Sequence, residues 1–275
     1  MISLSLDDVV LDLLPLHGGG VARFAVAGID IFRPFAGEFD RPTSLASFPL
    51  LPFSGRIDRG CFEAHGQKIC LPPNFDDEPL HALHGHGWQA PWSVITQTEN
   101  ILDLRYHHSA GDWPWCYLAG QSFRLGEAGY RHHLSIQNLG ETAMPTGLGL
   151  HPYFPRRAAS IETRFAARWL LDPDHLPTER LKLRENVNWW AGPVIDTGFD
   201  GFDGKIVLSW PTHRLTMDLD AALNHVVIYV PNDPSYFCVE PVSHVANAIN
   251  HDGMRWLEPG EAWSVAVDFS VALTG

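Results

Sequence analysis

The chain has 275 residues, of which 45% are hydrophobic and 11% aromatic, and its formal net charge is −13. This acidic balance, without any basic block, excludes nucleic acids and anionic membranes as partners, because both require clustered Lys and Arg. The chain is long enough for a large core, and all-β sandwiches of this length commonly form one domain, so we expect residues 1–275 to be a single domain.

The N-terminal segment and the cysteines favour a cytoplasmic location. Asp7, Asp8 and Asp12 stand where a signal peptide requires a basic start followed by an apolar run. No window of the sequence is long and apolar enough to predict a membrane span. The cysteines, at positions 61, 70, 116 and 238, include no C-x-x-C pair, which argues against zinc ribbons and thioredoxin-like chemistry and fits a reducing compartment.

Patterns typical of β-strands run through the whole chain. Residues 21–27 and 29–32 flank Gly28 as in a hairpin, and a proline-rich loop is predicted at 72–79. The remaining strands are predicted at 61–64, 67–71, 92–97, 101–108, 117–125, 129–138, 144–150, 161–171, 206–210, 215–219, 226–230, 236–239 and 264–273.

Helical periodicity is not convincing in any segment, and residues 3–14 have an ambiguous pattern. Many short strands separated by Gly and Pro turns predict an all-β chain with an antiparallel sandwich or barrel-like architecture. The sequence contains neither a linker that would divide the chain nor a repeat of fixed period.

The segment 226–247 carries the first candidate for chemistry. Its second predicted strand ends on Glu240, and Pro241 keeps the preceding backbone extended, so the carboxylate is expected at the exit of a strand. Beside the apolar residues 237–239 this carboxylate would be partly withdrawn from water, which raises its pKa and makes it a proton acceptor near neutrality. The alternative is a strand-end glutamate that faces solvent.

A second candidate is the segment 83–88, where His84 and His86 alternate with glycines ahead of Trp88. The glycines allow close approach of the backbone to a ligand. On a strand, the H-x-H spacing would point both imidazoles to one face, as metal ligation requires. His81 is near, but the carboxylate pattern of a cupin-like metal site does not follow. A histidine-rich surface loop is the alternative.

A third candidate is His151, which the predicted strand 144–150 delivers to its end, where Pro152 stops the ladder. Its apolar surroundings could tune the imidazole to donate or accept a proton near neutrality. The alternative is a half-buried histidine bonded to backbone. The histidine pairs at 107–108 and 132–133 lie inside strand patterns, so their members face opposite sides and do not form a site as pairs.

Two further segments offer polar groups. Residues 196–204 read as a polar, glycine-rich loop in which Asp196 and Asp200 are candidate ligands. The loop lacks the closing Glu of an EF-hand, which argues against a calcium site. Arg56 follows the Ser54-Gly55 break and could fork onto sugar hydroxyls or a carboxylate, the alternative being a surface ion pair.

Taken in order, these segments resemble the aldose 1-epimerase (galactose mutarotase) family. The similarity spans most of the chain through PFSGRI, LHGHGW, LGLHPYFP, a D-x-x-F motif and FCVEPVSHVAN. The resemblance implies a large antiparallel β-sandwich that binds a monosaccharide without a cofactor or a metal. It also implies that Glu240 is the general base and His151 the general acid.

The same resemblance implies that His84, Arg56 and Asp196 bind the substrate. Asp196 fits the D-x-x-F motif through Phe199, and Asp200 fits it only loosely. No role is assigned to His86, since the family varies at its position. The protein is expected to act as a monomer or a homodimer.

The implied activity is the interconversion of the α and β anomers of a free aldose by acid–base ring opening and closure. An epimerase for hexose 6-phosphates or for an unusual sugar is the alternative within the fold. A non-catalytic carbohydrate-binding protein, with Trp88 and Trp92 as stacking platform, is the alternative of another class. A metal-dependent β-barrel enzyme would use His84, His86 and His151.

Overall fold

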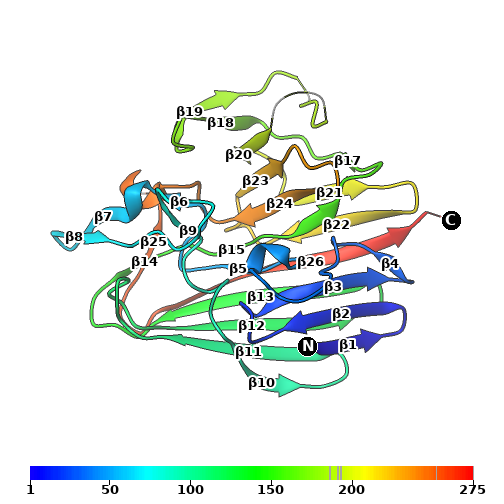
Figure 1. Ribbon diagram of the computed structural model, residues 1–275, viewed down its shortest axis with the longest axis horizontal. Helices are drawn as coiled ribbons and strands as arrows, with labels where there is room; N and C mark the ends of the chain where they lie inside the picture. Colours follow the sequence, from blue (N-terminus) through cyan, green and yellow to red (C-terminus); the bar gives the residue numbers. More distant parts are fainter. Residues whose placement is uncertain (186, 191, 193, 252, 275) are drawn as a thin grey trace.

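The computed structural model describes residues 1–185, 187–190, 192, 194–251 and 253–274. Within this part of the chain, strands dominate, and every pairing between named strands is antiparallel. The prediction of a large antiparallel β-sandwich is therefore confirmed (Figure 1). None of the described helices is long and apolar enough to cross a membrane.

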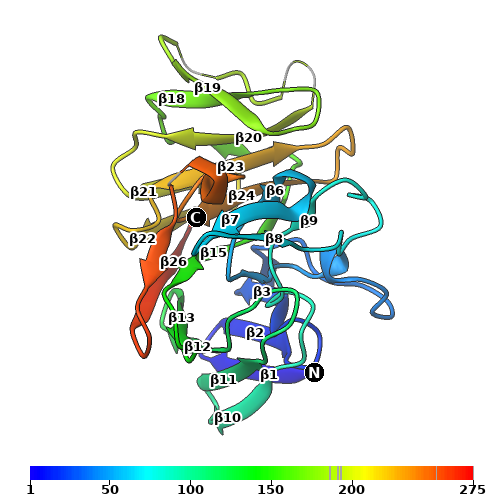
Figure 2. The same cartoon turned by 90° about the vertical axis from the view of Figure 1, so that its left-hand side faces the viewer.

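Two large sheets make up most of the molecule, and Figure 2 shows them in succession from β19 at the top to β10 at the bottom. The first has the order β10 (Ser93–Gln97), β11 (Ile101–His108), β12 (Tyr117–Gly126), β13 (Gly129–Asn138), β26 (Ala262–Leu273), β22 (His213–Leu219), β21 (Lys205–Ser209) and β17 (Ser160–Ile161). The second has the order β19 (Pro177–Lys182), β18 (Ala167–Leu171), β20 (Ile195–Asp200), β23 (His225–Val230), β24 (Tyr236–Val242), β15 (Gly149–Leu150) and β5 (Pro49–Leu50), with β16 (Tyr153–Pro155) also on β24.

Smaller sheets complete the fold. The N-terminal sheet contains β1 (Ile2–Leu6), β2 (Val9–Leu14), β3 (Gly20–Val26) and β4 (Ile29–Asp30). The two-stranded sheets pair β6 (Arg56–Ile57) with β9 (Ala82–Leu83), β7 (Cys61–Ala64) with β8 (Gln67–Cys70), and β14 (Met144–Thr146) with β25 (Arg255–Leu257). Single 3₁₀ turns lie at η1 (Pro42–Ser44), η2 (Asp58–Gly60) and η3 (Ala248–His251).

Aromatic side chains join the sheets into one core. Phe24 of the N-terminal sheet packs edge-on against Tyr130 and Phe269 of the first large sheet. Phe237 of the second large sheet lies 5.5 Å from Phe154 and 6.4 Å from Trp210, measured between ring centroids. The alternation of strand side chains sends these rings inward, which leaves the opposite face of β24 free to carry polar groups.

The predicted meander agrees closely with the structure, whereas the local predictions at 144–150, at 161–171 (which is split into β17 and β18) and at 196–204 were wrong. The ambiguous segment 3–14 forms the hairpin of β1 and β2, in which alternate residues are buried. The predicted loop at 196–204 begins as strand β20, and the predicted strand 144–150 is split into β14 and β15. The strand β19 was not predicted.

Strand β24 also does not end at Glu240 but continues through Pro241 to Val242. A proline inside a sheet removes a ladder donor. Here Pro241 lies opposite the interruption between β15 and β16, because Gly149 pairs with Val242 and Tyr153 pairs with Cys238. The missing N–H therefore falls where the ladder is already broken, and Glu240 is held in a continuous strand.

The cysteines differ from the reducing state that the sequence favoured. Cys61 and Cys70 face each other across the β7–β8 hairpin and form a disulfide. Cys116 and Cys238 remain thiols. The disulfide contradicts the expectation of a fully reduced set of cysteines, which rested on their scattered spacing, and the cytoplasmic location stays a prediction.

Candidate active site

A cavity of about 520 Å³ opens on the polar face of the second large sheet. Its wall includes residues of β20, β23 and β24 together with loop residues from the first third of the chain, which Figure 2 shows in front of these strands. All five residues proposed for catalysis or substrate binding line it, namely Arg56, His84, His151, Asp196 and Glu240. The fold thus brings together side chains that are up to 184 positions apart in the sequence.

Strand alternation places Glu240 in this cavity. Phe237 and Val239 point into the apolar core, so Cys238 and Glu240 point to the opposite face of β24. The Glu240 side chain is only 4% exposed. A carboxylate so nearly excluded from water is costly unless it is neutral or paired, which makes its protonation state the central question of the site.

His151 reaches the same point from the break between β15 and β16. Its backbone N–H donates to the carbonyl of Phe48, and its ring lies 4.6 Å from the Phe48 ring and 4.8 Å from the Tyr153 ring. This aromatic sandwich fixes the imidazole plane. The interruption of the ladder at His151 and Pro152 is what allows the side chain to turn toward β24.

His151 and Glu240 are in direct contact, with 3.2 Å between Nε2 and Oε1. Burial raises the pKa of the Glu240 carboxyl well above its ordinary value, and the nearby Asp196 charge raises it further. Burial also lowers the pKa of His151 to about 3. Both shifts favour the uncharged forms, so the pair holds one proton on the carboxyl side of the contact. The base and the acid that the resemblance implies therefore lie side by side.

His84 is held by a backbone that turns sharply. His84 and Gly85 both have positive φ, at 57° and 67°, and a Cβ on Gly85 would lie 2.2 Å from the Leu51 carbonyl oxygen. His84 Nδ1 accepts a hydrogen bond from the Gly55 N–H at 3.0 Å. Burial lowers the His84 pKa well below its ordinary value. The neutral imidazole therefore carries its proton on Nε2, which makes it a hydrogen-bond donor.

The turned backbone also separates His86 from His84, so the prediction that both imidazoles point to one face is wrong. His86 stacks on His108 with 4.4 Å between ring centroids, and its Nδ1 forms a hydrogen bond of 3.4 Å with the Tyr117 hydroxyl. Of the three histidines proposed as metal ligands, only His84 and His151 approach each other, with 5.4 Å between ring centroids. The alternative of a metal-dependent enzyme with His84, His86 and His151 as its ligands is therefore not supported by the structure.

Arg56 is held between two carboxylates. Its Nε donates to Glu78 at 2.6 Å and its Nη2 donates to Asp196 at 3.3 Å. All three side chains are partly buried, with exposed fractions between 15% and 25%. The Asp196 and Glu78 charges raise the pKa of Arg56, although burial opposes them. The guanidinium is thus fixed in the cavity wall, and its Nη1, which has no partner among the described residues, can donate to a ligand.

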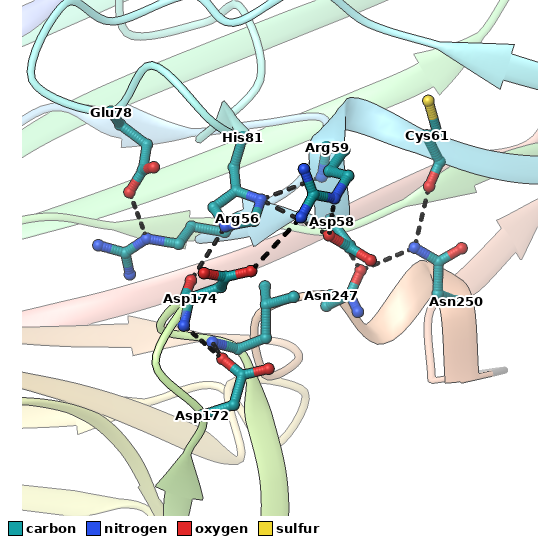
Figure 3. Close-up of polar contacts among 11 residues, drawn as sticks. Arg56, Asp58, Arg59, Cys61, Glu78, His81, Asp172, Asp174, Asn247 and Asn250 are labelled. Atoms are coloured by element: carbon teal, nitrogen blue, oxygen red, sulfur yellow. Dashed lines mark hydrogen bonds and ion pairs between the residues drawn. The ribbon is translucent and has the colours of Figure 1, made fainter.

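A polar network behind Arg56 anchors the short strand β6 (Figure 3). The Arg59 N–H donates to His81 Nδ1, and His81 Nε2 donates to the Asp174 carbonyl at 2.9 Å. The Asp58 N–H donates to the Asn247 side chain at 3.0 Å. These bonds tie η2 to the segment between β18 and β19 and to the start of η3, so the backbone that carries Arg56 cannot shift alone.

Asp200, the other aspartate considered from the sequence, lies away from the cavity. It is four residues beyond Asp196 on β20, which corresponds to about 13 Å along a strand. Arg180 binds its carboxylate with Nε at 2.9 Å and Nη2 at 2.5 Å. Asp196 therefore lines the cavity, whereas Asp200 is paired with Arg180 of β19 outside it.

Glu78 and Tyr229 line the cavity and were not identified from the sequence. Glu78 lies in the proline-rich loop, where an acidic residue gives no local signal of a partner. Tyr229 lies on β23 opposite Asp196, and burial raises its pKa to about 12, so its hydroxyl keeps its proton. The alternation of residues 226–230 was the one signal that could have placed Tyr229 on the cavity face.

If the implied interconversion of aldose anomers is measured, we expect the substitution Glu78→Gln to raise the KM for the aldose about tenfold with little change in kcat. The charged hydrogen bond to Arg56 is worth about 1.5–3 kcal/mol, and its loss leaves Arg56 free to rotate away from the ligand. The check is steady-state kinetics of the purified variant. The matched control is Asp77→Asn. Asp77 lies on the same loop as Glu78, but it pairs with the exposed Arg41, at 2.8 Å, and not with Arg56. Equal effects of both substitutions would contradict the positioning role.

The fold has counterparts among solved structures. A candidate aldose 1-epimerase from Escherichia coli K12 superimposes with a TM-score of 0.91 at 25% identity, covering 99% of this chain and 98% of that one. A galactose 1-epimerase from Lactobacillus acidophilus superimposes with a TM-score of 0.81 at 15% identity, covering 99% and 94%. The fold is thus that of the galactose mutarotase-like proteins.

The sequence comparisons agree with the structural ones. The profile of the family described as aldose 1-epimerase matches residues 2–270. The uncharacterized protein YphB of Escherichia coli K12 is 30% identical over 246 residues, which are 83% of this chain and 83% of YphB. The chain belongs to the aldose 1-epimerase family, as its motifs indicated.

Proposed function

We propose that the protein is a cofactor-independent aldose 1-epimerase that interconverts the α and β anomers of a free aldose. The observation that carries this proposal is the buried contact of Glu240 with His151 in the wall of a cavity of about 520 Å³. Membership of the family supports an isomerase of this type. The cavity volume is also large enough for a monosaccharide, because small ligands of this kind fit pockets at the low end of the usual range of volumes.

The reaction requires a base that removes the proton from O1 and an acid that protonates the ring oxygen. Both oxygens are bonded to C1 of the sugar, so two adjacent protein groups suffice. Transfer of the single shared proton from Glu240 to His151 Nε2 gives a carboxylate and an imidazolium, which are the base and the acid. The ring then opens to the aldehyde, rotation about C1–C2 follows, and closure on the other face reverses both proton transfers.

The remaining cavity residues bind the hydroxyl groups in this proposal. His84 Nε2–H donates to one hydroxyl, and Arg56 donates through the N–H groups that Glu78 and Asp196 leave free. The Asp196 carboxylate accepts a hydrogen bond from another hydroxyl while it holds Arg56 at 3.3 Å. Each group is fixed before the sugar arrives, so little side-chain freedom is lost on binding.

The charge of the cavity favours a free sugar over a phosphorylated one. Among the described residues that line it, Arg41 and Arg56 are the only Lys or Arg, and both are ion-paired. The lining carboxyl groups are Asp40, Asp77, Glu78, Asp196 and Glu240. A phosphate would lack a free cation and would meet these carboxylates, and an unpaired charge in such a place is costly.

The test is the rate at which freshly dissolved anomers equilibrate, followed by polarimetry. We expect rapid mutarotation of free aldoses such as galactose, and at least about tenfold slower mutarotation of their 6-phosphates, since each 1.4 kcal/mol of unfavourable charge costs about tenfold. Faster turnover of a hexose 6-phosphate would identify the alternative within the fold. Absence of acceleration on every sugar would overturn the proposed function.

A non-catalytic carbohydrate-binding protein is less well supported. Its proposed stacking platform, Trp88 and Trp92, is buried, with 0% and 1% exposure. Both indole N–H groups are bonded to backbone carbonyls, of Gly85 and Gly87. These tryptophans support the loop of His84 from behind and present no free face on which a sugar could stack.

A further inference from the structure

A third, buried group lies beside the pair of His151 and Glu240. His151, Cys238 and Glu240 each offer one ligand atom, and these three atoms lie within 4.8 Å of one another. Cys238 remains a thiol, is fully buried, and is not used in the proposed mechanism. A nitrogen, a sulfur and a carboxylate oxygen that converge in this way form a recognisable set of metal ligands.

The fold enforces this convergence. Cys238 and Glu240 are two residues apart on β24, so their side chains point to the same face. Cys238 is paired with Tyr153 of β16, and His151 lies two residues before that tyrosine. Two of the ligands therefore come from β24 and the third from the break between β15 and β16 beside it, and all three are buried.

The spacing of His151 and Glu240 suits a tetrahedral ion. With bonds of about 2.0–2.3 Å to oxygen, nitrogen and sulfur, neighbouring ligand atoms around Zn²⁺ lie about 3.2–3.6 Å apart. The separation of His151 Nε2 from Glu240 Oε1 is 3.2 Å. Since His151 and Glu240 also line the cavity, a fourth position would face the cavity and be open to water or to a sugar hydroxyl.

We propose that His151, Cys238 and Glu240 bind a thiophilic divalent cation, with Zn²⁺ as the best fit, and that the bound ion inhibits the enzyme. The ion would occupy the lone pairs of Nε2 and of the carboxylate, which are the positions that receive protons during ring opening. The inhibitory part of this proposal rests on the proposed function, whereas the binding part does not. Binding of the ion releases the protons that the thiol and the carboxyl carry, so it weakens as the pH falls.

The experiment is a titration of the purified full-length protein with ZnCl₂ in chelator-free buffer, followed by calorimetry and by mutarotation rates. We expect one site per chain, loss of activity in parallel with binding, and competition by a free aldose. Titration with Co²⁺ gives a second readout, since a thiolate ligand produces a charge-transfer band in the near ultraviolet. A protein that binds neither ion at the site would overturn the proposal.

The decisive variant is Cys238→Ser, with Cys238→Ala as a second variant if the first does not fold. Loss of one ligand should raise the inhibiting Zn²⁺ concentration at least about tenfold, because even residues that only orient a ligand contribute about 10–100-fold to metal affinity. Basal mutarotation should stay close to that of the unmodified protein. The matched control is Cys116→Ser, which removes the other thiol and should leave Zn²⁺ binding unchanged.

The outcomes separate the two proposals. Equal Zn²⁺ sensitivity of the Cys238 variants and the Cys116 control would overturn the metal site, even if mutarotation is fast. A Co²⁺ band that disappears in Cys238→Ser would support the site, even if no sugar is turned over and the proposed function fails.

Discussion

Replacement of Glu240 by Gln is expected to lower kcat for mutarotation by about 10²–10⁴-fold, which is the usual contribution of a positioned acid or base. The amide has nearly the shape of the carboxyl but cannot take the O1 proton. The substitution also removes the proton that Glu240 and His151 share, so His151 has no proton to transfer to the ring oxygen. KM should change little, because in the proposed function the sugar hydroxyls are bound by His84, Arg56 and Asp196.

The structure also predicts that Glu240→Gln folds normally. The carboxyl is buried with its proton, since burial raises its pKa, and an uncharged amide at the same place introduces no new charge. Thermal unfolding followed by circular dichroism is the check. Retention of most of the mutarotation rate by a folded Glu240→Gln variant would contradict the assignment of the base.

His151→Asn should have a comparable effect on kcat, because Asn keeps a polar group near Glu240 but cannot carry the proton to the ring oxygen. The two substitutions act on one shared proton, so the double variant should be scarcely slower than either single variant. The control is Asp200→Asn, which removes the partner of Arg180 outside the cavity and should leave kcat within about threefold.

The sequence predicted the architecture well where local patterns are strong. The strands β11 and β13 have the predicted bounds, because alternation and the flanking turns agree with the final pairing. Strand β20 was read as a loop, because its two aspartates and Gly198 have poor strand propensity. Its pairing with β18 and β23 overrides that propensity, since sheet formation depends mainly on cross-strand neighbours.

The site shows the same division between local and distant information. The motifs named Glu240, His151, His84, Arg56 and Asp196, and the structure places all five around one cavity. Their mutual arrangement could not be predicted from the sequence, because it depends on contacts between residues that are far apart along the chain. The broken ladder at β15, the positive φ of His84 and the clamp of Glu78 on Arg56 are consequences of packing that no short motif encodes.

The buried histidines give the second large expected effect, a steep loss of stability in acid. Burial lowers the pKa of His132 and His151 to about 3 and that of His86 and His244 to about 4. Unfolding exposes these groups, and each then takes up a proton at its ordinary pKa near 6.5. Between that pH and the folded values the unfolded chain binds more protons, so stability falls as the pH is lowered.

The size of this effect follows from the same shifts. One unit of pKa difference corresponds to about 1.4 kcal/mol, so four such histidines together represent several kcal/mol, a large share of the stability of an ordinary domain. Glu240 acts in the opposite direction, because its raised pKa makes the folded state bind a proton more tightly as the pH falls. It is one group against these four histidines and His84, whose pKa burial also lowers, so the net effect of acid is destabilising.

The measurement is denaturant unfolding at a series of pH values from 7 down toward 4, with His132→Leu as the informative variant. His132 is buried on β13 against Phe123, and its Nε2 donates to Gln121 Oε1 at 2.9 Å, while the described residues provide no partner for its Nδ1. Leucine replaces the imidazole with an apolar side chain that cannot titrate, at the cost of the hydrogen bond to Gln121. The variant should reduce the slope of unfolding free energy against pH by about one proton. His107→Leu, on the exposed side of β11, is the control and should keep the full slope. An unchanged slope in His132→Leu would show that this histidine is not kept neutral by burial.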